Sequence, residues 1–220
     1  MKIEVKKNIL ASNAVVAAGN RERLERHGVS MINLMASPGA GKTSVITRAI
    51  EGVRGELSLG VIEGDIASEI DSLAIEAMDV PAIQINTGGS CHLTAAMVGP
   101  ALDHLDLGAL DMIIIENVGN LVCPAEFDLG ETARVMIASV AEGHDKPHKY
   151  PLMFREVDAI IINKIDLLPY CDFDLPQFRQ IVAGLNPGAR LLELSCKDGF
   201  GAGDWCDWLL GAAARVSGGA

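Results

Sequence analysis

Residues 31–43 read Met-Ile-Asn-Leu-Met-Ala-Ser-Pro-Gly-Ala-Gly-Lys-Thr, and a helix-forming stretch follows up to residue 53. The part from Ala36 onward matches the phosphate-binding pattern G-x-x-x-x-G-K-[ST], except that Ala36 replaces the first glycine. Glycines let successive backbone N–H groups converge on phosphate oxygens, and the start of the helix adds its positive end. A strand before the loop and a helix after it favour a P-loop over an ordinary glycine-rich turn. The predicted nucleotide-binding residues here are Ser37, Gly39, Ala40, Gly41, Lys42, Thr43 and Ser44.

Short apolar runs alternate with helical stretches on both sides of this loop. The predicted strands are 31–35, 57–63, 82–86, 112–116, 135–140, 157–163 and 191–195, and the predicted helices are 8–27, 43–53, 67–78, 93–102, 175–185 and 205–215. Apolar strands without strict alternation, separated by helices, indicate an α/β fold with a doubly wound, mostly parallel sheet. We expect a short N-terminal helical segment, 1–28, before a P-loop domain, 29–220. Residues 141–151 are the most loop-like stretch and are predicted to be a functional insertion.

Composition excludes several classes of protein. The 220 residues are 49% hydrophobic and 21% charged, with a net charge of −11. Such an acidic chain repels phosphate backbones, which argues against general binding to nucleic acid or to an anionic membrane. No apolar run is long enough to span a bilayer. The five cysteines are odd in number and widely spaced, which predicts a reducing, cytoplasmic location instead of a disulfide framework.

Two later segments predict which base is bound. Asn163-Lys164-Ile165-Asp166 follows an apolar strand and has the N-K-x-D spacing of guanine-nucleotide proteins. A carboxylate at Asp166 can accept both N1–H and the 2-amino group of guanine, whereas adenine would leave that carboxylate without partners. Ser195-Cys196-Lys197 has the spacing of a loop that supplies a backbone N–H to guanine O6. Together they predict GTP and GDP as ligands, with Asn163, Lys164, Asp166, Ser195, Cys196 and Lys197 at the base.

Acidic residues at strand ends complete the phosphate side. Asp65 and Glu116 each end a predicted strand, and a carboxylate there can hold Mg²⁺ together with the Thr43 hydroxyl. Gly119 follows Glu116 with D-x-x-G-like spacing, so its N–H is predicted to bond the γ-phosphate. Asp65 is also a candidate for positioning the attacking water, with Lys42 as the second catalytic residue; a helix N-cap is the alternative role of Asp65.

A second kind of chemistry is suggested by Cys91, His92 and Cys123. Thiolate and imidazole ligands suit Ni²⁺ or Zn²⁺, and a glycine-rich turn at 88–89 allows adjacent residues to share one ion. Three ligands leave a four-coordinate ion incomplete, which a two-fold dimer would remedy. By spacing alone, ordinary turn or core residues remain an open alternative.

The ordered blocks ASPGAGKT, VIEGDIASEID, QINTGGSCHL, IIIENVGNLVCPAEFDLGE, EGHDKPHKYPLMF and NKIDLLPY resemble the hydrogenase nickel-incorporation GTPases, the HypB family. The resemblance covers about residues 8–210 and implies a dimerising G domain, similar to urease-accessory and signal-recognition-particle GTPases. It implies slow, regulatory GTP hydrolysis and a nickel or zinc site at the dimer interface, on Cys91, His92 and Cys123. The implied partners are a second copy, a zinc-binding HypA-like accessory protein and the hydrogenase large subunit. The sequence has no His-rich tract of the kind some members carry, which places transferable metal at this site.

Two other functions compete with a GTP-hydrolysing metallochaperone. A small-molecule kinase could share the P-loop fold, although the N-K-x-D and Ser195–Lys197 segments argue against it. A metal-storage or scaffold protein could bind nucleotide without hydrolysing it, and measurable GTPase activity lost in Lys42→Ala would eliminate that function.

Overall fold

The computed structural model describes residues 5–65, 75 and 77–217, without the side chains of residues 5, 6, 65 and 217. Its strands are β1 (Ser30–Ala36), β2 (Leu59–Asp65), β3 (Ala82–Asn86), β4 (Met112–Glu116), β5 (Ala133–Ser139), β6 (Ala159–Asn163) and β7 (Arg190–Leu194). They form one seven-stranded sheet in the order β3-β2-β4-β1-β5-β6-β7, and every pair is parallel. The predicted doubly wound sheet is confirmed, with predicted strand ends within three residues of those observed.

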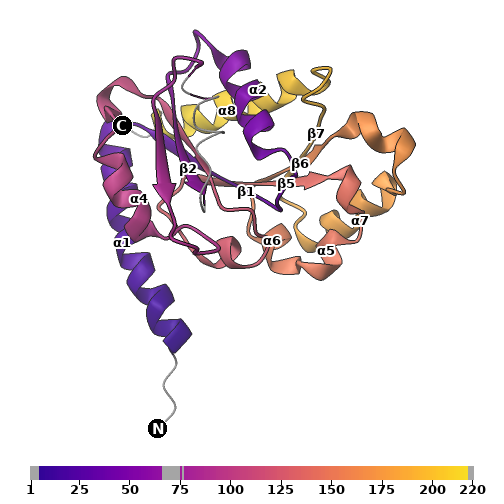
Figure 1. Ribbon diagram of the computed structural model, residues 1–220, viewed down its shortest axis with the longest axis horizontal. Helices are drawn as coiled ribbons and strands as arrows, with labels where there is room; N and C mark the ends of the chain where they lie inside the picture. The colour runs from indigo at the N-terminus through magenta and orange to yellow at the C-terminus, as the bar shows by residue number, and fades with distance from the viewer. Residues whose placement is uncertain (1–4, 66–74, 76, 218–220) are drawn as a thin grey trace.

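Helices cover both faces of the sheet (Figure 1). They are α1 (Val5–His27), α2 (Lys42–Val53), α4 (Ala95–Leu102), α5 (Lys146–Lys149), α6 (Pro151–Arg155), α7 (Leu175–Leu185) and α8 (Ala202–Ser217). Short 3₁₀ helices are η1 (Leu107–Ala109), η2 (Cys123–Glu126), η3 (Val140–Glu142) and η4 (Ile165–Tyr170). The predicted helix over 67–78 falls largely outside the described residues. No helix in the described part of the chain is both long and apolar enough to cross a membrane.

Side chains of β1 show how the core is divided between the two faces. Ile32 and Leu34 point into the cluster formed with α2 and α8, where Trp205 is fully buried. Met31 belongs to the cluster under α1 and α4, and Met35 to the one under α6 and α7. Because successive side chains alternate across a strand, a central strand covered on both sides is apolar at most positions, and in β1 only Ser30 and Asn33 are polar. The chain reverses its winding direction at β1, so the loop after β1 lies where ligands bind in such sheets.

The stretch 141–151 is not the irregular loop that its composition predicts. It forms part of η3, all of α5 and the start of α6. Pro147 and Pro151 each stand in the first turn of a helix, where the missing N–H has no intrahelical acceptor to lose. Proline therefore begins these helices instead of preventing them, and His148 lies in α5 while His144 precedes it.

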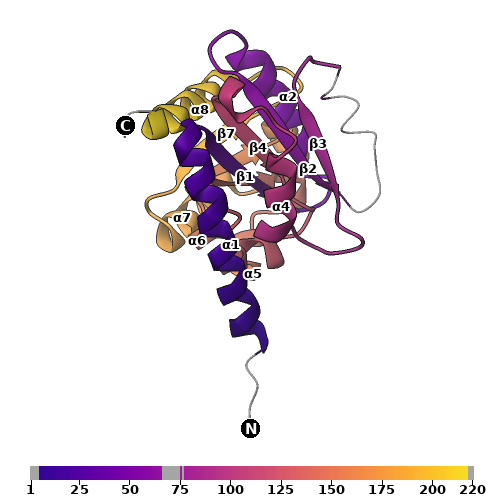
Figure 2. The same cartoon turned by 90° about the vertical axis from the view of Figure 1, so that its left-hand side faces the viewer.

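Helix α1 lies beside α4, and its N-terminal part projects from the body (Figure 2). Its buried stripe is Asn13, Ala17, Asn20 and Leu24, at helical spacing. Asn13 Oδ1 accepts a hydrogen bond from Ala95 N at 2.9 Å. Asn20 Nδ2 donates to Ala95 O and to Leu129 O, both at 3.0 Å. Two asparagines, and not a purely apolar face, thus fix the helix to the start of α4.

Replacing Asn20 should destabilise the protein. Asn20→Ala leaves the buried carbonyls of Ala95 and Leu129 without this donor, so the free energy of unfolding should fall by about 1–3 kcal/mol. Val15→Ala on the same helix is the control, because Val15 is 74% exposed and should change stability by less than about 0.5 kcal/mol. Urea titrations measure both values, and equal unfolding midpoints for the two variants would contradict the role of Asn20.

Candidate functional site

The loop after β1 has the backbone of a phosphate-binding loop. Gly39 and Gly41 have φ angles of +75° and +100°, which side chains rarely allow. A Cβ on Gly41 would also lie 2.5 Å from Asn163 Nδ2. Gly41 is the N-cap of α2, which begins at Lys42, so the free N–H groups of the helix face the loop. The predicted residues Ser37–Ser44 therefore form a turn at the carboxyl edge of the sheet whose backbone geometry suits an anion.

Glu116 lies opposite the start of α2 at the end of β4. Lys42 Nζ is 3.8 Å from Glu116 Oε1, and Thr43 Oγ1 is 3.2–3.3 Å from the two carboxylate oxygens. A hydroxyl and a carboxylate are the hard oxygen ligands that Mg²⁺ takes beside phosphates, so the donor set fits this ion. The backbone of Asp65 ends β2 on the same edge, in register with Asn86, while its side chain lies outside the described part of the chain.

Gly119 lies against the phosphate loop. A Cβ at Gly119 would stand 3.0 Å from Pro38 N and 3.1 Å from Pro38 Cα, so any other residue here would push against the backbone of the loop. The structure thus brings the predicted γ-phosphate segment next to the loop that would hold the phosphates.

The base-recognition segment is tied directly to the same loop. Asn163 Nδ2 donates to Ala40 O at 2.8 Å, and Lys164 Nζ donates to Gly39 O at 2.8 Å. Lys164 adopts a left-handed φ of +60°, a strained conformation for a residue with a side chain, and such strain concentrates at binding sites. Two segments more than 120 residues apart therefore form one rigid unit.

Asp166 borders a cavity of about 560 Å³ beside α2. The cavity is lined by Gly41, Ser44, Thr47, Arg48, Glu51, Asn163, Lys164, Asp166, Leu167, Cys196 and Lys197. Ser195 Oγ donates to Asp166 Oδ1 at 2.9 Å, which orients the carboxylate. Burial raises the pKa of the Cys196 thiol to about 11, so this group is a neutral thiol at physiological pH. All six residues predicted to read the base lie at this cavity or contact a residue that lines it.

Sequence reasoning missed two residues at this site. Arg48 donates from Nε and Nη2 to Cys196 O at 3.0 and 2.7 Å, which fixes the loop that follows β7. Arg48 lies four residues after Ser44, so both side chains are on one face of α2. This helical periodicity is the sequence signal that could have identified Arg48. Glu142, within the insertion predicted to be functional, accepts a hydrogen bond from Ser37 Oγ. The two residues are 105 positions apart in the sequence, and no local sequence pattern indicates their contact.

Cys91, His92 and Cys123 are brought together as predicted. One ligand atom from each lies within 4.8 Å of the others. Cys91 Sγ is 3.3 Å from Cys123 Sγ and 3.6 Å from His92 Nδ1. Ligands bound at 2.0–2.3 Å from one ion lie within such separations, so the cluster fits a single Ni²⁺ or Zn²⁺. Cys91 is exposed, and the other two are partly buried, so the cluster opens at the surface.

The surroundings of the cluster control its protonation. The contact with Cys91, followed by burial, raises the pKa of Cys123, so this thiol is protonated in the metal-free protein. Burial lowers the pKa of His92, whose ring packs on Phe127 with centroids 4.1 Å apart. A neutral imidazole is ready to bind a metal ion, whereas the thiol must first lose its proton.

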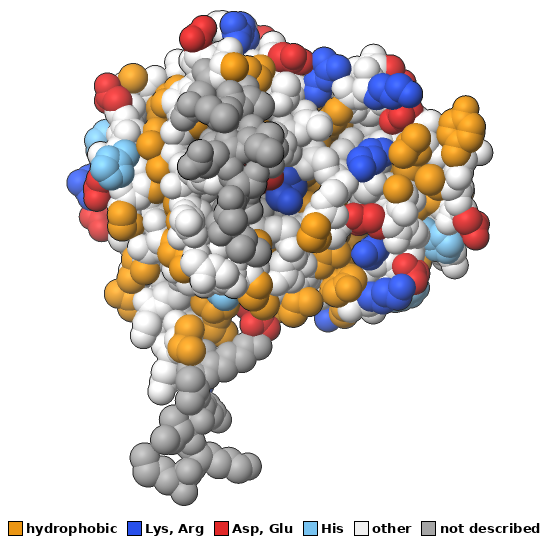
Figure 3. All heavy atoms as spheres, in the orientation of Figure 1, with side chains coloured by type: hydrophobic (Ala, Val, Ile, Leu, Met, Phe, Trp, Pro, Cys, Tyr) orange, Lys and Arg blue, Asp and Glu red, His pale blue; other side chains and the backbone are white. Residues whose placement is uncertain are grey.

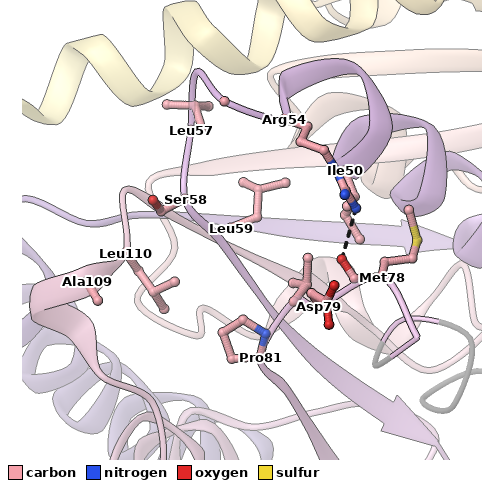
Figure 4. Close-up of a pocket in the computed structure, with 12 residues that line it drawn as sticks. Ile50, Arg54, Leu57, Ser58, Leu59, Met78, Asp79, Pro81, Ala109 and Leu110 are labelled. Carbon is pink, nitrogen blue, oxygen red and sulfur yellow. Dashed lines mark hydrogen bonds between the residues drawn. The ribbon is translucent and has the colours of Figure 1, made fainter.

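A separate cavity of about 420 Å³ lies at the opposite edge of the sheet (Figure 4). Apolar side chains such as Ile50, Leu59 and Leu110 line most of it, and Arg54 donates to Met78 O at 2.9 Å across it. No residue predicted to bind nucleotide or metal lines this cavity. On the face shown in Figure 3, the described Lys and Arg side chains are interspersed with Asp and Glu.

The chain has relatives among known proteins. The CobW/HypB/UreG nucleotide-binding domain matches residues 30–193. The hydrogenase maturation factor HypB of Azotobacter vinelandii is 47% identical over 207 residues, which cover 94% of this chain and 68% of that protein. The crystal structure of Helicobacter pylori HypB in complex with nickel superposes with a TM-score of 0.89 at 36% identity, covering 93% of this chain and 96% of that one.

A more distant likeness concerns the fold alone. The signal recognition particle receptor FtsY of Elizabethkingia anophelis, in complex with GDP, has a TM-score of 0.54 at 16% identity, covering 85% of this chain and 70% of that one. The family domain matches residues 30–193, and the Azotobacter vinelandii HypB is 47% identical. On these two findings, the chain belongs to the CobW/HypB/UreG family of nucleotide-binding proteins, and within it to the HypB proteins.

Proposed function

We propose that this protein is a GTP-hydrolysing metallochaperone that carries Ni²⁺, or Zn²⁺, during maturation of [NiFe]-hydrogenase. The observation that carries the proposal is the direct continuity of two sites: Glu116 contacts Thr43 of the phosphate loop, and Cys123 of the metal cluster follows seven residues later. A nucleotide site alone would suit many P-loop proteins. A thiolate–imidazole cluster on the segment that leaves the phosphate site suits a carrier whose cargo responds to nucleotide.

Guanine specificity is supported by the arrangement of Asp166. Its carboxylate borders the base cavity, and Ser195 holds one of its oxygens. Arg48 holds the Cys196 carbonyl and so restrains the loop whose N–H groups we assign to guanine O6. A small-molecule kinase would have no need for this carboxylate-and-loop combination.

For hydrolysis, Lys42 is assigned to the β- and γ-phosphates, and Thr43 and Glu116 to Mg²⁺, which would neutralise charge developing on the phosphates. Gly119 N–H is assigned to the γ-phosphate and Asp65 to the attacking water. The assignment of Lys42 is supported by its position at the start of α2, where its Nζ lies 3.8 Å from Glu116 Oε1 and a phosphate could replace that carboxylate as its counter-ion. The role of Asp65 in positioning the attacking water stays a prediction.

The metal cluster supports a dimeric carrier. Cys91, His92 and Cys123 give an ion three ligands at the surface, beside Val122, which is 54% exposed. A second copy across a two-fold axis would complete the coordination. The nickel complex of a similar HypB supports nickel as cargo. The hydrogenase large subunit and a zinc-binding HypA-like protein are the proposed partners, and the cytoplasm is the proposed location.

The decisive experiment follows nickel through one turnover. The GDP- and GTP-bound protein, loaded with one equivalent of Ni²⁺, is mixed with a chelator, and nickel transfer and phosphate release are recorded together. Transfer that requires GTP and is absent in Lys42→Ala supports the carrier. Phosphate release without any effect on nickel would favour a GTPase that acts only by docking to partners, and GTP binding without hydrolysis would favour a storage protein.

Base recognition yields a specificity switch. Asp166→Asn exchanges an acceptor for a donor, so the variant should prefer xanthosine triphosphate, whose C2 oxygen accepts a hydrogen bond. Affinity for GTP should fall by about 1–3 kcal/mol, or roughly 5- to 150-fold. Calorimetry with both nucleotides measures the exchange. GTP binding as tight as in the unmodified protein would show that Asp166 does not contact the base.

Removal of one thiol should abolish the metal site. Cys123→Ala leaves only Cys91 and His92 near the ion, so stoichiometric binding of Ni²⁺ and Zn²⁺ should be lost. Cys171→Ala is the control, because Cys171 packs near the cluster of α6 and α7, away from the metal ligands. Native mass spectrometry with one equivalent of metal distinguishes them, and retained binding in Cys123→Ala would remove Cys123 from the site.

Nickel affinity should depend on pH in one direction. Because the contact with Cys91 raises the pKa of Cys123, metal binding must displace a thiol proton at neutral pH. His92, whose pKa is lowered by burial, is already neutral there. Apparent affinity should therefore weaken as pH falls through neutrality, by about tenfold per pH unit for each proton released. Titrations at several pH values test this, and an affinity independent of pH would rule out thiolate ligands.

A further inference from the structure

The metal-binding turn is held from both sides of His92 by asparagine side chains. Asn117 Oδ1 accepts a hydrogen bond from Leu93 N at 3.2 Å, directly after His92. Asn120 Nδ2 donates to Cys91 O at 3.1 Å, directly before it. The turn with Cys91 and His92 is thus attached to the segment that leads to Cys123.

The same two asparagines are anchored by their main chains to β1 and the phosphate loop. Asn117 N donates to Leu34 O at 3.0 Å, and Asn120 N donates to Ala36 O at 2.8 Å. Between them, Gly119 touches Pro38 with no room for a Cβ. Any movement of this segment towards a γ-phosphate must therefore displace both asparagines.

The chemistry of these positions requires a side chain that can both accept and donate. Asn117 is 1% exposed, and its Oδ1 also accepts from Val118 N at 2.9 Å. Its Nδ2 donates to Asn33 Oδ1 at 3.1 Å, so both ends of the amide are bonded in the core. Asn120 Oδ1 accepts from Val122 N at 2.8 Å while Nδ2 reaches Cys91. Neither an aliphatic nor a carboxylate side chain reproduces these sets.

We propose that Asn117 and Asn120 are positioning residues that transmit the nucleotide state to the metal ligands, by holding the Cys91–His92 turn to the segment beside the phosphate loop. Neither side chain binds metal or nucleotide. This inference rests on the proposed function and deepens it, because it assigns the coupling to two amide side chains. Without these two side chains the three metal ligands remain, but the Cys91–His92 turn no longer moves together with the segment beside the phosphate loop.

The primary test is Asn120→Ser. A serine hydroxyl can still accept from Val122 N, as in a serine-initiated turn, but is too short to reach Cys91 O. Asn86→Ser is the matched control, because Asn86 Oδ1 bonds Gly88 N at the other end of the same loop without any link to Cys91 or Leu93. Nickel affinity and the sulfur-to-nickel absorption band are measured for each protein with GDP and with a non-hydrolysable GTP analogue.

In the unmodified protein and in Asn86→Ser, nickel affinity should differ between the two nucleotide states by at least about fivefold. In Asn120→Ser nickel should still bind, about tenfold more weakly, and the two affinities should become equal within about twofold. The absorption band should shift, which a change in global stability alone would not cause. A fivefold ratio and an unchanged band in Asn120→Ser would overturn the role of Asn120.

Asn117 gives an independent check through two substitutions that differ in the oxygen facing Leu93 N. Asn117→Asp keeps the oxygen that accepts from Leu93 N, whereas Asn117→Ala removes it. Nickel affinity should fall further in Asn117→Ala than in Asn117→Asp, with GDP affinity and thermal unfolding recorded for both. Equal nickel affinities in the two variants would overturn the role of Asn117. An unmodified protein that fails to bind nickel or GTP would instead refute the proposed function, so the two failures are distinguishable.

Discussion

The register between β1 and β4 is the constraint on which the rest of the structure depends. Leu34 lies opposite Glu116, two residues before the phosphate loop begins at Ala36. This offset places the Glu116 carboxylate against the Thr43 hydroxyl, and it lets the chain after β4 continue bonding to β1, as Asn120 N does to Ala36 O. A shift of two residues in the register would separate the carboxylate from the start of α2 and would move the metal ligands away from the nucleotide.

Charge balance explains why this arrangement can respond to nucleotide. Lys42 and Glu116 form a mostly buried ion pair, with side chains 12% and 10% exposed. Removing one charge of such a pair is strongly unfavourable unless another takes its place. Under the proposed function, a phosphate on Lys42 and Mg²⁺ on Glu116 would replace both partners together, so that nucleotide and Mg²⁺ would satisfy the site only as a unit. The segment after Glu116 would then adjust to the new ligands through its bonds to β1.

Much of this structure could be predicted from sequence because the signals are local. Seven apolar runs predicted the strands, and glycine spacing together with Lys42 predicted the phosphate loop. Contacts between distant segments could not be predicted. The hydrogen bond from Arg48 to Cys196 O, for example, joins residues 148 positions apart, and the residues next to either one in the sequence do not indicate it. The helices within 140–155 could not be predicted from the loop-like composition of 141–151, although proline favours the first turn of a helix. Asn20 was missed because a buried amide does not raise the hydrophobicity of a helix face.

The metal cluster joins two segments with different attachments, and this difference determines how it can release an ion. Cys123 follows the segment whose main chain is bonded to β1, whereas Cys91 belongs to a turn attached to that segment through the side-chain amides of Asn117 and Asn120. Metal–ligand distances vary by only about 0.2 Å in good sites. The two sulfurs are 3.3 Å apart, so a relative displacement of about 1 Å, an ordinary amplitude for a switching segment, would exceed that tolerance several-fold. Under the proposed function, release would therefore need no large rearrangement: a small change in the separation of the two segments would be sufficient to turn a binding geometry into a non-binding one.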